Sequence, residues 1–425
     1  MLSDLSGVWR FRLDDGKGFE QGWTSAPLPD AMTMPVPASY NDIKEGVSFR
    51  DHYGWVFYQR SLSVPAYVRE RQRVVLRCDA VTHHARVYLN GVLLTEHFGG
   101  FLPFEVELNE ALREGENLLT IAVDNVIDYT TLPVGGDKPM LSMPLGGAAR
   151  LPVKKQNNPN FDFFNYCGIT RPVRLYTTPK TYLADISLWA DVADPLAEEV
   201  SAVLHYQAEV CGPQAGVSPV KVELFDKAGV KVAESCGAEG ALHLEHVTLW
   251  QPLKAYLYEV RVTAGEDVYT LPYGIRTVKV EGRRFLINGR PFYFKGYGWY
   301  VGAPDLEGPE MLLREELKAW EALGKPLVIT EHGADTVMGF HDTTPVMYTE
   351  EYQLAYYEMN NRVFDEFPFV VGEHVWNFAD FATSQGLLRV QGNKKGLFTR
   401  DRKPKLAAHY FRRRWTAIPD FGYKA

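Results

Sequence analysis

Short runs of alternating apolar and polar residues fill the first 273 residues, and turn-forming residues interrupt them about every eight to twelve positions. The segment 86–97 is an example, because two β-rich runs flank the pair Asn90-Gly91. That pair tolerates the positive φ angles of a type I′ hairpin. Such a pattern is typical of β-sandwiches and excludes a helical bundle for this part of the chain.

Two sandwiches are predicted, because the alternating runs become shorter after the segment 176–179. We assign residues 1–178 to a jelly-roll β-sandwich, in which the segment 99–108 contributes aromatic residues. Residues 179–273 contain shorter strands, such as 220–225, and suit an immunoglobulin-like β-sandwich.

Helices and strands alternate in residues 274–425. The predicted elements are, in order, a helix over 310–323, a buried strand over 327–329, a helix over 350–367, a strand over 370–376 and a helix over 404–415. This order is that of the final quarter of a (β/α)₈ TIM barrel. The region has 152 residues, whereas a complete barrel needs about 250. The third domain is therefore predicted to be an incomplete barrel.

Charge and cysteine usage restrict the partners of the chain. Its 45 basic and 53 acidic residues give a net charge of −8, which disfavours binding to nucleic acid or to a membrane surface. The four cysteines lie far apart, so we expect reduced thiols, no metal site and a cytoplasmic protein. The start of the sequence, MLSDLSGVWRFRLDD, does not resemble a signal peptide or a membrane span.

Glu331 is the first candidate for chemistry, because it follows the predicted strand 327–329 almost directly. The carboxyl ends of the strands form the catalytic face of a TIM barrel. A carboxylate held there could attack the anomeric carbon of a sugar and form a covalent glycosyl ester. The alternative is a carboxylate that only accepts hydrogen bonds from neighbouring loops.

Three long segments resemble the β-glucuronidases of glycoside hydrolase family 2. They are VKKQNNPNFDFFNYCGITRPV (153–173), ITEHGAD (329–335) and VVGEHVWNFADFATSQGLLRVQGNKKGLFTRDRKPK (370–405). The resemblance covers essentially the whole chain. It implies a retaining glycoside hydrolase of carbohydrate metabolism that releases D-glucuronic acid from β-D-glucuronides, needs no cofactor, and forms a homo-oligomer, commonly a tetramer.

The resemblance also implies roles for individual residues. Glu331 matches the nucleophile, while Asn393 and Lys395 match an N-x-K motif that contacts the sugar carboxylate. Arg389 matches a further basic residue near the acid group. Composition alone would make the segment NKK an exposed basic turn, and its longer context favours the binding role.

Three more residues match positions near the sugar. Trp376 matches an aromatic wall at the end of the eighth strand, Asp162 matches a residue that reaches the sugar from the first domain, and Tyr300 matches a tyrosine beside the nucleophile. A core tryptophan and an aspartate that caps a turn are the alternatives for Trp376 and Asp162.

A large part of the barrel is missing between Gly296 and Tyr297, where the first strand leads directly into the segment that follows the sixth strand in relatives. The missing part would contain the general acid/base, a glutamate preceded by asparagine. The one Asn-Glu pair of the sequence, Asn109-Glu110, lies in the jelly roll and does not match, and Glu373 belongs to a different family segment. We therefore assign no acid/base.

Two explanations of the gap remain open. Either the printed chain omits a segment that the enzyme has, or the protein lacks it and leaves sheet edges exposed. A catalytically incomplete carbohydrate-binding remnant is accordingly the second functional hypothesis. A β-galactosidase-like or β-mannosidase-like hydrolase is a third, and it is disfavoured because those substrates lack the carboxylate that Lys395 would meet.

Overall fold

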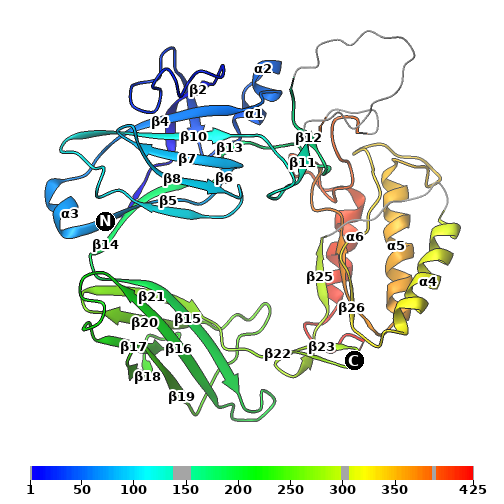
Figure 1. Ribbon diagram of the computed structural model, residues 1–425. Helices are drawn as coiled ribbons and strands as arrows, with labels where there is room; N and C mark the ends of the chain where they lie inside the picture. The colour runs from blue at the N-terminus through cyan, green and yellow to red at the C-terminus, as the bar shows by residue number, and fades with distance from the viewer. Residues whose placement is uncertain (1, 137–154, 298–305, 385–388, 425) are drawn as a thin grey trace, which may run out of the picture. The chain divides into compact units, whose positions relative to one another are not determined.

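The computed structural model describes residues 2–136, 155–297, 306–384 and 389–424 (Figure 1). The chain divides into two compact units, Met1–Tyr182 and Leu183–Ala425, which are described separately. Within the described residues, no helix combines the length and the apolar character that a membrane crossing requires.

The first unit is a β-sandwich, as predicted. Its smaller sheet has the order β1 (Leu2–Asp4), β14 (Val173–Pro179), β5 (Gln72–Cys78) and β9 (Phe104–Glu107). Its larger sheet has the order β3 (Met32–Val36), β2 (Gly7–Leu13), β4 (Trp55–Ser63), β10 (Glu116–Asp124), β7 (His84–Leu89) and β8 (Val92–Phe98). Short pairs are formed by β6 (Val81–Thr82) with β13 (Gly168–Ile169), and by β11 (Gly135–Gly136) with β12 (Asn158–Pro159). Three short helices join the strands: α1 (Tyr40–Ile43), α2 (Val47–Arg50) and α3 (Ala66–Arg71).

The predicted hairpin of the first unit is confirmed. Asn90 and Gly91 connect β7 to β8 with φ angles of 54° and 85°, as a type I′ turn requires. The strand predicted over 99–108 is shorter than expected. Only the stretch 104–107 pairs with β5, because 99–103 form the turn that carries the chain from one sheet to the other.

The second unit begins with another sandwich of two antiparallel sheets. One sheet contains β15 (Tyr182–Val192), β16 (Ala202–Cys211) and β19 (Glu239–Leu244), and the other contains β18 (Lys231–Cys236), β17 (Val220–Phe225), β20 (Tyr258–Ala264) and β21 (Asp267–Tyr273). Alternate residues of these strands form a shared apolar core. This arrangement agrees with the predicted immunoglobulin-like fold. The connecting ribbon consists of β22 (Val278–Glu281), β23 (Arg284–Ile287) and β24 (Arg290–Pro291).

The last segment contains a small parallel sheet with the order β25 (Phe294–Tyr297), β27 (Val370–Val375), β26 (Leu327–Ile329). Three helices accompany it: α4 (Glu307–Glu321), α5 (Glu350–Glu366) and α6 (Leu406–Ala417). In Figure 1 they stand side by side, with α5 between α4 and α6. Every helix and strand predicted here is present, with ends shifted by at most three residues.

One expectation about this sheet is wrong. The strand 327–329 was expected to be buried, yet all three residues of β26 are half-exposed. β26 lies at an edge of a three-stranded sheet, so it lacks the neighbour on one side that a complete barrel would supply. The central strand β27 has neighbours on both sides, and Val370 and Val375 are fully buried.

Local signals explain where the helices begin. The side chain of Thr349 caps α5 by accepting a hydrogen bond from the backbone N–H of Tyr352 at 3.1 Å. α6 has no side-chain cap of its own at Lys405. The buried carboxylate of Glu350 accepts from the N–H of Leu406 at 2.7 Å instead, which ties the start of α6 to the start of α5.

Candidate active site

Glu331 lies two residues beyond β26, at the carboxyl end of the parallel sheet. Its side chain is half-buried. Partial burial raises the pKa of Glu331 above its ordinary value of 4.5, and the positive charge of Lys395 opposes this rise. The structure therefore brings Lys395 within electrostatic range of the predicted nucleophile.

The ends of β26 and β27 are held against each other. The backbone N–H of Trp376 donates to the carbonyl of His332 at 2.8 Å. A Cβ atom at Gly333 would overlap the carbonyl of Trp376 and would lie 2.8 Å from the hydroxyl oxygen of Tyr357. Glycine is therefore required at 333, and this close approach places Glu331 and Trp376 at the same end of the sheet.

His332 is a neutral, structural neighbour of Glu331. Its Nδ1 contacts the carbonyl of His374 at 3.0 Å, and its Nε2 has no partner among the described residues. The ring packs edge-on against Tyr357 and Phe364. Burial lowers the pKa of His332 from 6.5 to about 4, so this side chain carries no charge at neutral pH.

Asn393 and Lys395 are buried, with 0% and 3% of their surface exposed. The backbone N–H of Lys395 donates to Oδ1 of Asn393 at 2.9 Å, and its carbonyl accepts from the N–H of Asn377 at 3.1 Å. A Cβ atom at Gly396 would overlap the backbone around Asp380. The segment is thus packed inside the domain, and the alternative of an exposed basic turn is wrong.

Asp335 joins the two predicted cationic residues and was missed by the sequence analysis. Its carboxylate lies 3.3 Å from Nη1 of Arg389 and 3.8 Å from Nζ of Lys395. It also accepts from the backbone N–H of Lys394 at 3.0 Å. Asp335 lies four residues after Glu331 in ITEHGAD, and a carboxylate so close to the predicted nucleophile was the available signal.

Trp376 lies immediately after β27 and is half-buried. Its indole ring meets the ring of Phe381 edge-on, with centroids 5.8 Å apart. The indole N–H is buried and has no hydrogen-bond partner within the described ranges. A buried donor of this kind calls for a ligand or a water molecule, which agrees better with a binding wall than with an ordinary core tryptophan.

Asp162 belongs to the first unit, where it is half-exposed in the loop between β12 and β13. Asparagine side chains on both sides of this loop are hydrogen-bonded to one backbone carbonyl. The side-chain amides of Asn157 and Asn165 donate to the same carbonyl, that of Asn125, at 2.8 and 3.3 Å. Tyr300 lies outside the described residues.

Glu373 is fully buried in β27 and has a structural role. Its carboxylate accepts hydrogen bonds from Tyr293, Asn361, Arg414 and Trp415, all at 2.8 to 2.9 Å. Burial would raise the pKa of Glu373, and the contacts with Arg414 outweigh that effect and lower it. Because these contacts enclose the carboxylate and use both of its oxygens, the structure gives Glu373 a packing role rather than that of a general acid.

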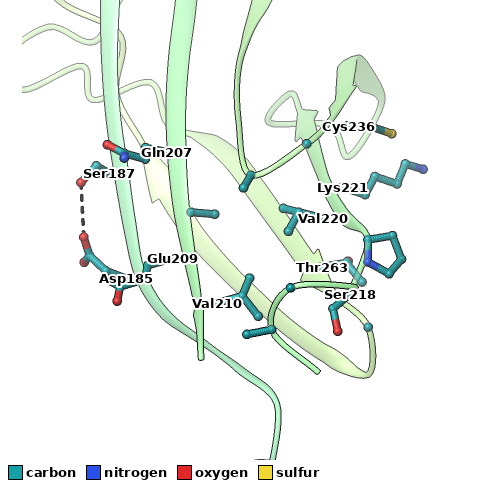
Figure 2. A pocket seen from close by; sticks show the side chains of 17 residues that line it. Asp185, Ser187, Gln207, Glu209, Val210, Ser218, Val220, Lys221, Cys236 and Thr263 are labelled. Atoms are coloured by element: carbon teal, nitrogen blue, oxygen red, sulfur yellow. Dashed lines mark hydrogen bonds between the residues drawn. The ribbon is translucent and has the colours of Figure 1, made fainter. Parts of the chain in front are cut away.

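An open groove of about 1160 Å³ lies in the second sandwich, between strands of its two sheets (Figure 2). Asp185 and Ser187 of β15, Gln207 of β16 and Thr263 of β20 are among its lining residues. None of the predicted site residues lines it. In the described part of the chain, no group of three or more His, Cys, Asp or Glu side chains is arranged to hold a metal ion.

Two segments of the chain match domains of one known enzyme family. Residues 2–179 match the sugar binding domain of glycosyl hydrolases family 2, and residues 297–419 match the TIM barrel domain of the same family. A β-glucuronidase of Paenibacillus borealis is 32% identical, with 100% of this chain and 98% of that protein covered. The human β-glucuronidase is 30% identical, with 98% and 91% covered.

Solved structures agree with this classification. The structure of a Bifidobacterium dentium β-glucuronidase complexed with coumarin-3-O-glucuronide superposes with a TM-score of 0.90 at 33% identity, covering 100% of this chain and 98% of that one. A Ruminococcus gnavus β-glucuronidase in complex with D-glucuronic acid gives 0.89 at 28% identity, covering 98% and 97%. The chain therefore belongs to the β-glucuronidases of glycosyl hydrolases family 2.

The alignment also shows how much shorter this chain is than a relative. The comparison with the Paenibacillus protein extends over 599 residues and includes all 425 residues of this chain, which leaves 174 aligned positions without a counterpart here. β25 ends at Tyr297, directly at the predicted junction. The three strands β25, β26 and β27 are the part of the barrel sheet that the described residues retain.

Proposed function

We propose that this chain acts on β-D-glucuronides, with Glu331 as the nucleophile and with Asn393 and Lys395 binding the carboxylate of the sugar. The observation that carries this proposal is the buried position of Lys395, whose Nζ lies 3.8 Å from the carboxylate of Asp335, four residues after Glu331. A nucleophile and a buried cation at one end of a sheet suit a sugar that bears an acid group.

The reaction follows the two-step retaining route. The carboxylate of Glu331 attacks the anomeric carbon, an ester bond forms, and the bond to the aglycone oxygen breaks. Water then attacks the same carbon and loses a proton to the solvent, while the ester bond breaks, which releases glucuronic acid and restores the carboxylate of Glu331. The ring of Trp376 offers a flat apolar face to the C–H groups of the sugar. Neither step needs a cofactor.

The missing acid/base restricts the substrates that this chain can cleave. The one Asn-Glu pair of the sequence is Asn109-Glu110, and the amide of Asn109 is engaged by the backbone of residues 69, 72 and 74 in the first sandwich. An aglycone that leaves readily as an anion does not need protonation. We therefore propose that aryl glucuronides with acidic phenols are the substrates of this chain.

The test of this function is the substitution Lys395→Ala, assayed with an aryl β-D-glucuronide and the matching β-D-glucoside. Loss of one charge-assisted contact predicts at least a tenfold drop in kcat/KM for the glucuronide and a much smaller change for the glucoside. Lys403→Ala is the control, because the side chain of Lys403 is 64% exposed and forms a surface ion pair with exposed Asp401 at 3.0 Å. Equal losses on both substrates would contradict the proposal.

A carbohydrate-binding protein without turnover is the second candidate. Two observations favour it: the absent Asn-Glu motif in the barrel segment and the exposed edge strand β26. Calorimetry with glucuronate together with a chromogenic assay separates the candidates. Binding without release of any phenol would favour the second candidate, and release of phenol by this chain excludes it.

The cellular setting is also a proposal. The four cysteines are free, including the exposed Cys236, which supports a reducing compartment such as the cytoplasm. A homotetramer is expected from the resemblance alone. Sedimentation equilibrium of the purified chain tests this state.

A further inference from the structure

A buried ion pair lies beside the residues assigned to the sugar carboxylate. Nζ of Lys405 and Oδ1 of Asp380 are 2.8 Å apart, and their side chains are 0% and 7% exposed. Lys405 ends the segment DRKPK, and Asp380 lies in WNFAD after β27. Neither residue has a part in the mechanism proposed above.

All three protons of the Lys405 ammonium group have acceptors. Besides Asp380, Nζ donates to the carbonyl of Thr336 at 3.1 Å and to the carbonyl of Lys394 at 2.9 Å. An ammonium group has three donors and no acceptor, so its hydrogen-bonding capacity is used completely inside the protein. Lys405 therefore joins the segment after Glu331 to the segment that contains Lys395.

Asp380 holds the other side of the same segment. Its Oδ1 also accepts from the backbone N–H of Gly396 at 3.0 Å. The pair thus binds the carbonyl of Lys394 and the N–H of Gly396, which are the main-chain groups on either side of Lys395. Both peptide planes next to Lys395 are fixed by two buried charges.

The electrostatics of the pair agree with this structural role. Burial lowers the pKa of Lys405 and raises the pKa of Asp380, and each charge opposes the shift of the other. Burying two charges is expensive, and removing one partner leaves the other uncompensated. An ion pair at this position therefore constrains the geometry of the segment more strictly than an apolar contact of the same size would.

We propose that Lys405 and Asp380 are positioning residues that set the preference of the site for a carboxylate at C6, because they fix the backbone on both sides of Lys395. The inference rests on the proposed function, since it gives Lys395 the role of binding that carboxylate. It adds a specificity-determining pair that does not touch the sugar.

The experiment compares two inhibitors that differ only at C6, uronic deoxynojirimycin and deoxynojirimycin. Their dissociation constants are measured by calorimetry for the unmodified chain, Lys405→Met, Asp380→Asn and the control Lys403→Met. The melting temperature of each variant is measured in parallel. Asp380→Asn keeps an acceptor for Gly396 and is nearly isosteric, so it provides the answer if Lys405→Met does not fold.

We expect the preference of the unmodified chain for the uronic inhibitor to fall about tenfold in Lys405→Met and severalfold in Asp380→Asn, as expected when a charge-assisted contact is misplaced. Affinity for deoxynojirimycin should change less than about twofold. The control should retain the full preference, because Lys403 is exposed.

Two results would overturn the inference. If both variants bind the two inhibitors with an unchanged ratio, the pair has no influence on specificity. If both affinities fall equally and in proportion to the melting temperature, the pair is merely structural. The unmodified chain provides a separate check, because a lack of preference for the uronic inhibitor there would refute the proposed function itself.

Discussion

As the proposed nucleophile, Glu331 must be ionised to attack a sugar, and the partial burial of its side chain disfavours ionisation. Burial raises the pKa of Glu331 above 4.5, and Lys395 limits that rise. Protonation therefore removes the nucleophile at a pH above the value typical of an exposed glutamate.

We predict that the rate of phenol release from an aryl glucuronide falls on the acid side with a midpoint above pH 4.5. Stopped-flow measurements from pH 4 to pH 8 would check this. In Lys395→Ala the midpoint should move further upward, because the charge that opposes the shift is gone. A midpoint that stays in place, or moves down, would count against the proximity of the two groups.

A second prediction at the scale of one residue concerns His332 and the pH dependence of the free energy of unfolding. The folded protein holds its pKa at about 4, whereas the unfolded chain has the ordinary value of 6.5. Between pH 6.5 and pH 4 the imidazole of His332 is protonated in the unfolded chain but neutral in the folded protein. The free energy of unfolding therefore decreases as the pH falls through this range. The total loss is about 3 kcal/mol.

Replacement of His332 by asparagine should flatten this dependence, because Asn cannot be protonated and its amide can replace Nδ1 as a donor to the carbonyl of His374. Urea denaturation of the second unit at several pH values between 4 and 7.5 gives the slopes. The same slope in both proteins would show that another group causes the acid sensitivity.

Most residues of the predicted site lie in short contiguous motifs. Glu331 lies two residues after the strand 327–329, and Asn393 and Lys395 belong to one N-x-K motif. Asp335 forms an ion pair with Arg389, which lies 54 residues further along the chain. The position of Asp335 near Glu331 is visible in the sequence, but a local pattern does not predict this long-range contact. The burial of Lys395 was equally unpredictable, because lysine is normally exposed.

At the scale of elements, β27 and the helices α5 and α6 are connected through Glu373. Its carboxylate accepts from Asn361 of α5 and from Arg414 and Trp415 of α6. Arg414 also pairs with Asp365 of α5. The fully buried carboxylate therefore holds two helices against the central strand of the small sheet.

We predict that Glu373→Gln lowers the free energy of unfolding of the second unit by about 3 kcal/mol, because it leaves the buried guanidinium of Arg414 with less compensation. Glu281→Gln is the control. Glu281 pairs with exposed Lys279 at the surface, so its loss should cost less than about 1 kcal/mol. Chemical denaturation measures both, and equal effects would contradict the structural role of Glu373.

The elements themselves were predictable because the helices and strands carry strong local patterns. The exposure of β26 depends on its neighbours. Leu327, Val328 and Ile329 form an apolar run that normally indicates a buried strand, and here the strand lies at an edge. A sequence pattern indicates which secondary structure a segment favours, whereas the burial of a strand depends on which other strands pair with it.

At the scale of the whole molecule, the chain combines a segment that matches the sugar binding domain of family 2 with a partial barrel. The family relation rests on matches along the entire chain, and the 174 unmatched positions lie inside the alignment. A chain with the nucleophile but without the acid/base should complete the first chemical step with a reactive substrate. The second step should be slow, because no base activates the attacking water.

The most direct measurement is therefore the mass of the intact protein after incubation with 2,4-dinitrophenyl β-D-glucuronide, followed by peptide mapping. We predict that the 48.1 kDa chain gains one glucuronosyl residue on the peptide containing Glu331. Glu331→Gln and the matching glucoside should give no adduct. An adduct on a residue other than Glu331 would contradict this role of Glu331. The absence of any adduct, together with equal binding of the glucuronide and the glucoside, would contradict both this role and the preference for a sugar carboxylate.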